Sequence, residues 1–211
     1  MPCTNKVNAV TQAAFRPRLS FEEYVDFCAQ TNERYELVHG ELKKITPATW
    51  QHILIAQFLE QSFNSEIKRL QAAWIAIRES GQRTEQDSSR LPDVSVIPFE
   101  EIAKFLKQTA IIDIPAFLVV EIVSPSSAAE DYGAKLGEYQ TIKVPECWIV
   151  DCEALGAAKH LGFPKMPTIT VNQLAENGIY ESQQFRGSDR IISKTFPECQ
   201  LTVEEIFRMG R

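Results

Sequence analysis

The chain has 211 residues, which is enough for one ordinary domain with a sizeable buried core. Hydrophobic residues make up 44% and charged residues 24%, a composition typical of folded globular proteins and not of disordered or fibrous ones. Lys and Arg total 22 against 28 Asp and Glu, so the formal net charge is −6. This balance argues against a protein that coats nucleic acid by charge alone. It is compatible with an enzyme acting on nucleic acid, because catalytic carboxylates add negative charge.

The two ends and the cysteines carry little targeting information. No apolar run approaches the roughly 18 to 20 residues of a membrane-spanning helix, and the N-terminus lacks the apolar core of a secretory signal. The five cysteines have no metal-site or redox spacing, which predicts free thiols in a cytoplasmic protein. Residues 1–18 carry three bases and no acid. We expect them to form a loosely ordered basic arm ahead of a single domain over residues 19–211.

The first part of the chain predicts a helix, a hairpin and a long helix. The capping box Ser20-Phe-Glu-Glu23 predicts a short helix over 21–30. The alternating segment 35–45, with His39-Gly40 at its middle, predicts a tight β-hairpin. Apolar residues at helical spacing then predict a long amphipathic helix over about 50–71.

The rest of the chain alternates between short strands and short helices. The run FLVVEIV at 117–123 is nearly all apolar, which predicts a strand buried on both faces of a sheet. The other predicted elements are strands at 73–77, 91–97, 147–151, 168–171, 178–185 and 190–194, a polar loop at 81–90, and helices at 98–107, 127–142 and after Thr202. This order predicts an α+β fold in which a mixed central sheet is flanked by helices and extended by hairpins.

Two carboxylates fall on predicted core strands. Glu121 lies inside FLVVEIV, where an ionised side chain is costly to bury without a partner, and Asp93 lies early in LPDVSVI. Side by side, they could hold a hard divalent cation such as Mg²⁺, which polarises a phosphate and generates hydroxide from water. Alternatively, Glu121 ends its strand at the surface and Asp93 caps a turn.

Lys135 is a candidate partner for these acids. If the helix after the strand packs back antiparallel, Glu121 lies roughly 10 Å from the strand end at about 3.3 Å per residue. Lys135 then lies roughly 12 Å into the helix at about 1.5 Å per residue, at a similar height. There it could orient the attacking water or stabilise charge on a phosphoryl group. Alternatively, Lys135 is a solvated lysine paired with Asp131 four residues earlier.

Several short motifs follow one another in a fixed order. They are Tyr35-Glu-Leu-Val-His-Gly-Glu-Leu42, His52, Pro92-Asp93-Val94, Val120-Glu-Ile-Val-Ser-Pro125, Lys135, Tyr139 and Trp148-Ile-Val-Asp151. With these motifs the sequence resembles the Uma2 family, also called DUF820, of the PD-(D/E)XK nuclease superfamily, from about residue 20 to the C-terminus. The resemblance implies a restriction-endonuclease-like core and phosphodiester hydrolysis that depends on Mg²⁺ or Mn²⁺.

The same resemblance implies roles for particular residues. Asp93 and Glu121 match the metal-binding acids, and the backbone carbonyl of Ile122 is the expected third ligand. The usual E-x-K motif of the superfamily is missing, because Val123 stands where the lysine is expected. Lys135, on the following predicted helix, fits the place of a displaced catalytic lysine.

Three further motif residues have two interpretations each. Glu36 is either an additional acid near the metal or a hairpin residue that faces solvent. His52 opens the long helix, either as a surface histidine or in a catalytic role. Tyr139 either contacts a phosphate or packs in the core.

We therefore expect a Mg²⁺-dependent endonuclease that acts on DNA and, by analogy with restriction-type enzymes, works as a homodimer. One alternative is a catalytically inactive dimeric protein of the same fold that binds nucleic acid or serves as a scaffold. The net charge of −6 and the missing E-x-K motif favour that alternative. A second alternative is a metal-dependent hydrolase of small phosphorylated molecules, which needs no basic groove.

Overall fold

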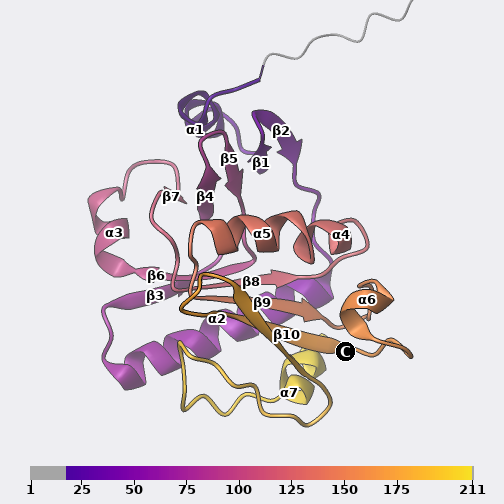
Figure 1. Ribbon diagram of the computed structural model, residues 1–211. Helices are drawn as coiled ribbons and strands as arrows, with labels where there is room; N and C mark the ends of the chain where they lie inside the picture. The colour runs from indigo at the N-terminus through magenta and orange to yellow at the C-terminus, as the bar shows by residue number, and fades with distance from the viewer. Residues whose placement is uncertain (1–17, 211) are drawn as a thin grey trace, which may run out of the picture.

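The computed structural model describes residues 18–210, which form two β-sheets with helices around them (Figure 1). The predicted basic arm lies outside the described residues except for Arg18. The α+β class, with mixed sheets flanked by helices, is confirmed. Within the described part, no helix combines the length and the apolar character needed to cross a membrane. The described cysteines are free, as predicted: Cys28, Cys147, Cys152 and Cys199.

The helices and strands alternate along the chain, and most bounds agree with the predicted ones. The helices are α1 (Phe21–Ala29), α2 (Trp50–Leu70), α3 (Phe99–Lys104), α4 (Ala128–Asp131), α5 (Ala134–Thr141), α6 (Ala158–Leu161) and α7 (Val203–Arg208). The strands are β1 (Tyr35–Val38), β2 (Glu41–Lys44), β3 (Trp74–Ile77), β4 (Gly81–Glu85), β5 (Ser88–Arg90), β6 (Val94–Pro98), β7 (Ile111–Ile112), β8 (Leu118–Ile122), β9 (Glu146–Asp151), β10 (Thr168–Leu174) and β11 (Tyr180–Phe185).

The larger sheet has the order β11-β10-β9-β8-β6-β3, and β8 lies inside it. Its β8–β9 pair is parallel and the other pairs are antiparallel. Every residue of β8 is buried, which confirms the strand predicted from FLVVEIV. Alternation along a strand sends Val120 and Ile122 to the face covered by α2 and sends Val119 to the other face. Glu121 therefore points to the face on which α5 lies (Figure 1).

The smaller sheet, β2-β1-β5-β4-β7, contradicts the loop predicted at 81–90. That segment is the hairpin β4–β5, and half of its residues are buried polar side chains: Gln82, Thr84, Ser88, Ser89 and Arg90. Gln82 shows why, because its amide donates to the Ile114 carbonyl and accepts from the Ala116 N–H, both at 3.0 Å. The loop prediction failed because these polar residues are hydrogen-bonded to segments far away in the sequence, and local sequence does not show such partners.

Two further predictions differ from the structure. The helix predicted over 127–142 is divided at Gly133, where an added Cβ would lie 2.7 Å from the Ala129 carbonyl oxygen. The strand predicted over 190–194 is wrong, since Arg190 forms only an isolated bridge to Thr202. The short elements α6 and β7 were not predicted, because neither is long enough to show a periodic pattern.

Candidate active site

Strands β6 and β8 bring the two predicted metal-binding acids next to each other. Their antiparallel register pairs Val94 with Val120, and one further step places Asp93 opposite Glu121. The Ile122 N–H donates to Asp93 Oδ2 at 2.7 Å, which ties the Asp93 carboxylate to the strand that carries Glu121. The alternative in which Glu121 lies at the surface is wrong, because this residue is 2% exposed inside β8.

Both oxygens of Glu121 accept hydrogen bonds from α5. Lys135 Nζ donates to Oε2 at 2.9 Å, and the Tyr139 hydroxyl donates to Oε1. Burial raises the pKa of the Glu121 carboxyl above its ordinary value; Lys135 opposes this shift, and the nearby carboxylates add to it. Glu121 is therefore a carboxylate whose negative charge is costly and depends on neighbouring positive charge.

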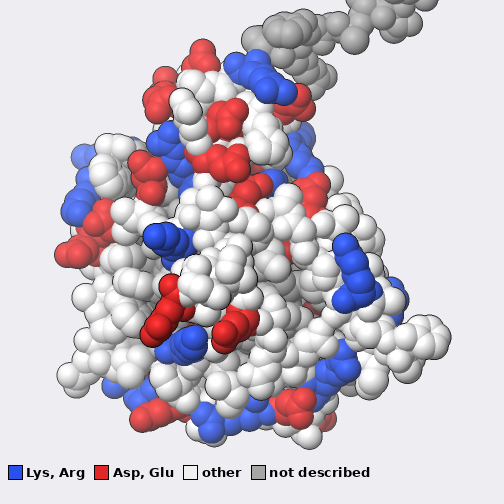
Figure 2. Space-filling view, in the orientation of Figure 1, with Lys and Arg blue, Asp and Glu red and all other residues white. Residues whose placement is uncertain are grey.

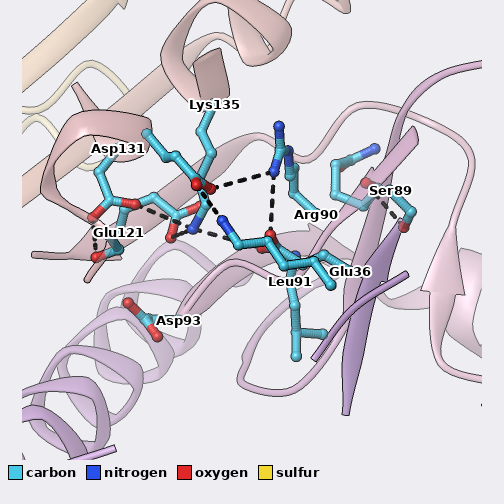
Figure 3. A network of polar contacts seen from close by, with 12 residues as sticks. Glu36, Ser89, Arg90, Leu91, Asp93, Glu121, Asp131 and Lys135 are labelled. Carbon is cyan, nitrogen blue, oxygen red and sulfur yellow. Dashed lines mark hydrogen bonds and ion pairs between the residues drawn. The ribbon is translucent and has the colours of Figure 1, made fainter. Parts of the chain in front are cut away.

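Lys135 is the centre of the cluster, as the height estimate predicted. Its ammonium lies 2.9 Å from Glu121 Oε2, 3.1 Å from Asp131 Oδ1 and 3.6 Å from Glu36 Oε1 (Figure 3). Burial alone would lower the pKa of Lys135, but these carboxylates outweigh it and raise the pKa well above its ordinary value. The solvated alternative is wrong, although the predicted contact with Asp131 does form.

Asp131 is a site residue that the sequence reasoning considered only as a surface partner of Lys135. It is 1% exposed, and Ser127 Oγ donates to its Oδ2 at 2.6 Å. Its Oδ1 accepts no hydrogen bond in the described part of the chain and has only the ion-pair contact with Lys135. The spacing of four residues before Lys135 was the one signal that could have identified it.

Glu36 faces the site and not the solvent, so that alternative is also wrong. It is 2% exposed on β1, and the Leu91 N–H donates to its Oε1 at 3.1 Å. Arg90 links it to the next acid: its Nη1 donates to Glu36 Oε2 at 3.2 Å and its Nε to Glu138 Oε2 at 2.8 Å. Arg90 was not assigned to the site because it lies in the segment predicted to be a polar loop, and Glu138 was not assigned because its partner Arg90 lies 48 residues away in the sequence.

His52 contacts Asp93 directly. Its Nε2 lies 2.7 Å from Asp93 Oδ1, and the two side chains are 18% and 22% exposed. Burial alone would lower the pKa of His52, but the hydrogen bond and charge of Asp93 outweigh it and raise the pKa. His52 is partly exposed at the start of α2 and contacts Asp93, so both of its interpretations stay open, and Asp93 is also partly exposed.

Tyr139 cannot contact a phosphate, because it is 0% exposed within the core. Its hydroxyl donates to Glu121 and fixes the orientation of that carboxylate. Burial raises the pKa of the Tyr139 hydroxyl well above its ordinary value, so the group acts as a donor. The alternative in which Tyr139 packs in the core is therefore correct, and its hydroxyl in addition donates a hydrogen bond to Glu121.

The network holds more acidic than basic side chains. Its members are Glu36, Glu121, Glu130, Asp131 and Glu138, with Lys135 and Arg90, and Asp93 lies beside Glu121, directly before the neighbouring strand. Burial raises the pKa of two of these carboxyls, Glu121 and Asp131, because their negative charge is costly there. Carboxylate oxygens are the ligands that hard divalent cations prefer, and Asp131 Oδ1 is a buried oxygen without a donor. The oxygen donors therefore suit a divalent cation in kind, although no three of these side chains bring ligand atoms within 4.8 Å of one another in the described part of the chain.

A second group of possible ligands lies in the smaller sheet. The ligand atoms of His39, Glu85 and Asp87 all lie within 4.8 Å of one another. His39 Nδ1 already pairs with Glu85 Oε2 at 3.2 Å, which accounts for their closeness. The group shares no residue with the network around Lys135.

The chain matches the family model Uma2, described as "Putative restriction endonuclease", over residues 21–204. The chain belongs to the Uma2 family. A search of curated proteins gave no match. A crystal structure described as "a putative nuclease belonging to DUF820" from Anabaena variabilis ATCC 29413 aligns with a TM-score of 0.69. The alignment has 18% sequence identity and covers 92% of this Uma2 chain and 99% of that one, so it shows a shared fold.

Proposed function

We propose that this Uma2 chain is a metal-dependent endonuclease that hydrolyses phosphodiester bonds in DNA. The observation that supports the proposal is the buried excess of carboxylates around Lys135, with Asp93 at its solvent-reaching side. The description of the family as restriction endonucleases agrees with this chemistry. The homodimer and the cytoplasmic location expected from the sequence are part of the same proposal.

Asp93 and Glu121 would hold Mg²⁺ or Mn²⁺, together with the backbone carbonyl of Ile122. A cation bound there supplies a Lewis acid for the phosphate and lowers the pKa of a bound water. Each carboxylate oxygen has lone pairs beyond the hydrogen bonds it accepts here, so Glu121 can keep Lys135 and Tyr139 as partners. His52 and the Ile122 N–H hold one oxygen each of Asp93, which fixes its orientation.

Lys135 takes the role that the superfamily gives to the lysine of E-x-K. Its ammonium is held among three carboxylates, so its position needs no reorganisation when substrate arrives. From that position it can orient the attacking water or stabilise charge on the phosphoryl group. The missing E-x-K therefore argues less for an inactive protein, because α5 brings a lysine within 2.9 Å of Glu121.

The inactive alternative has one observation in its favour. The Lys135–Glu121 ion pair is complete without a cation, so the fold can keep both charges buried in the absence of metal. A scaffold or binding protein of the same fold would need nothing more. Metal binding separates this candidate from the endonuclease.

The test of the proposed function is cleavage of a supercoiled plasmid with Mg²⁺ or Mn²⁺, with EDTA as the metal-free arm. We expect metal-dependent nicking by the wild type that is lost in Asp93→Ala and in Lys135→Ala. Glu181→Ala removes an exposed acid of β11 and is the matched control. Metal-dependent cleavage that persists in both site variants would contradict the assignment. Release of phosphate from mononucleotides but not from oligonucleotides would favour the small-molecule hydrolase.

A further inference from the structure

Two aromatic side chains are unusually exposed. Among the large hydrophobic residues that the structure describes, Phe163 is 93% exposed and Trp50 is 80% exposed, more than any other. A single exposed hydrophobic residue is ordinary in a folded protein. The position of these two is what makes them informative: Trp50 begins the helix that carries His52, and Phe163 follows the helix whose His160 stacks on Tyr132.

Trp50 is the first residue of α2, the helix that also carries His52. It lies two residues before His52, whose Nε2 is 2.7 Å from Asp93 Oδ1. The helix begins here because Thr49 caps it, with its side chain accepting from the His52 N–H. The cap therefore fixes the start of the helix that carries both residues, although Trp50 and His52, two positions apart, point to different sides of α2.

Phe163 lies in the turn that follows α6. His160 of α6 stacks on Tyr132, with ring centroids 4.7 Å apart and an interplanar angle of 17°. Tyr132 directly follows Asp131, so the stack connects α6 to the network around Lys135. Figure 1 shows the start of α2, α4 and α6 at the same edge of the molecule, with the turn after α6 projecting from it.

The segments that carry the two aromatics lack acids. Residues 42–59 and 154–175 contain no Asp or Glu, in a chain that has 28 of them. Around Phe163 the charged residues are Lys159 and Lys165, both exposed. Arg186 adds a third base, since its guanidinium donates to the Leu161 carbonyl at 2.6 Å. In Figure 2 blue side chains flank the side of the molecule on which α6 lies.

We propose that Trp50 and Phe163 stack on nucleobases of the DNA substrate on either side of the carboxylate site. The inference rests on the proposed function and names the means of binding. Base stacking on aromatic rings is tolerant of sequence and does not depend on net charge. A chain of net charge −6 could therefore bind DNA even though few Lys and Arg side chains contact the phosphates. The alternative occupant, a second copy of the chain, is disfavoured because its lysines would meet those of the first.

The test is the affinity for a fluorescein-labelled DNA duplex with unpaired central bases, measured by anisotropy in EDTA so that no cleavage occurs. We expect Trp50→Ala and Phe163→Ala each to raise Kd by about 10-fold. Leu106→Ala is the matched control, because Leu106 is 73% exposed and follows α3. Its Kd should stay within about 2-fold of wild type, since Leu106 is a single exposed hydrophobic residue that lies away from the site.

The dependence of Kd on salt separates stacking from charge. Trp50→Ala and Phe163→Ala remove no charge, so the slope of log K against log salt should equal that of the wild type. Lys165→Ala should reduce that slope by about 0.9 if the lysine contacts a phosphate. Unfolding curves of the variants should match the wild type, because both aromatics are exposed.

Three outcomes would overturn the inference. One is a wild type that binds no DNA, and another is a Kd in both aromatic variants equal to that of Leu106→Ala. The third is a dimer, seen by sedimentation without DNA, that becomes monomeric in the aromatic variants while DNA binding is kept. Binding that depends on the aromatics, without cleavage in any metal, would support the inference and contradict the endonuclease. If the wild type cleaves DNA and both aromatic variants bind it normally, the endonuclease is supported and the stacking inference is contradicted.

Discussion

Two neighbouring strands of the larger sheet each bury a glutamate, and the two glutamates are satisfied in opposite ways. Glu121 on β8 is 2% exposed and Glu146 on β9 is 0% exposed. Glu121 has a cation and a hydroxyl as donors and lies among other carboxylates. Burial alone therefore does not distinguish the glutamate proposed to bind metal from the one that does not reach the candidate site.

Glu146 has only neutral donors around it. It accepts from Trp148 Nε1 at 2.6 Å, from the Lys194 N–H at 2.7 Å and from the Thr195 N–H and hydroxyl at 2.9 and 3.1 Å. These bonds hold the segment after β11 against the sheet. The comparison teaches that a buried carboxylate with a full set of neutral donors stabilises the fold. Several carboxylates around one lysine ammonium, as at Lys135, instead favour the binding of a metal ion.

The largest difference between the two glutamates should be in catalysis. Glu121→Gln should lower metal-dependent cleavage by about 1,000-fold, because a metal site contributes several kcal/mol to the transition state. Glu146→Gln should leave the rate per folded molecule close to that of the wild type. The measurement is the initial rate of plasmid nicking, corrected for the folded fraction. Equal losses in the two variants would remove the distinction.

Stability should show the reverse order. Glu146→Gln brings an amide donor to a place where three residues already donate, and we expect it to lower the free energy of unfolding by about 3 kcal/mol. Glu121→Gln should change it by less than about 1 kcal/mol, because burial raises the pKa of the Glu121 carboxyl, so the folded state gains little from its negative charge. Urea denaturation without metal measures both. A larger loss in Glu121→Gln would mean that its ion pair is mainly structural.

A smaller effect should be seen in the pH dependence of stability, which depends on the ion pair between Arg90 and Glu138. Burial alone would raise the pKa of Glu138, but the hydrogen bond and charge of Arg90 outweigh it and lower the pKa. Because the folded-state pKa is lowered, the stabilisation is complete above the ordinary glutamate pKa and is lost as pH falls through the folded-state value. Between about pH 5 and pH 3 the wild type should lose on the order of 1 kcal/mol more than Glu138→Gln. Parallel stability curves for the two proteins would contradict this assignment.

Much of the fold could be predicted from local pattern. The capping box at Ser20, the turn at His39-Gly40 and the apolar run of β8 each fix an element through its own residues. The hairpin β4–β5 could not be predicted in this way, since its buried polar residues find their partners on distant segments. The break between α4 and α5 lies at Gly133, where a Cβ would lie 2.7 Å from the Ala129 carbonyl oxygen, a steric detail that periodicity does not show.

The centre of the site could be predicted because strand and helix rise are regular. Those two distances placed Lys135 level with Glu121, and the structure has Lys135 Nζ 2.9 Å from Glu121 Oε2, although the single helix assumed in the estimate is divided at Gly133. The other charged residues near Lys135 could not be placed from the sequence, because Glu36 and Arg90 reach the site from the smaller sheet. How the smaller sheet lies on α5 is a tertiary property. The roles of Asp93 and Glu121 as metal ligands, and of the Ile122 carbonyl, stay predictions.

Calorimetric titration with Mn²⁺ tests the central claim most directly, because it requires neither a substrate nor cleavage. The account predicts that the wild type and Glu146→Gln bind Mn²⁺ alike and that Glu121→Gln and Asp93→Ala lose this binding. A wild type that binds no Mn²⁺, or a Glu121→Gln variant that binds it as well as the wild type, would contradict the account.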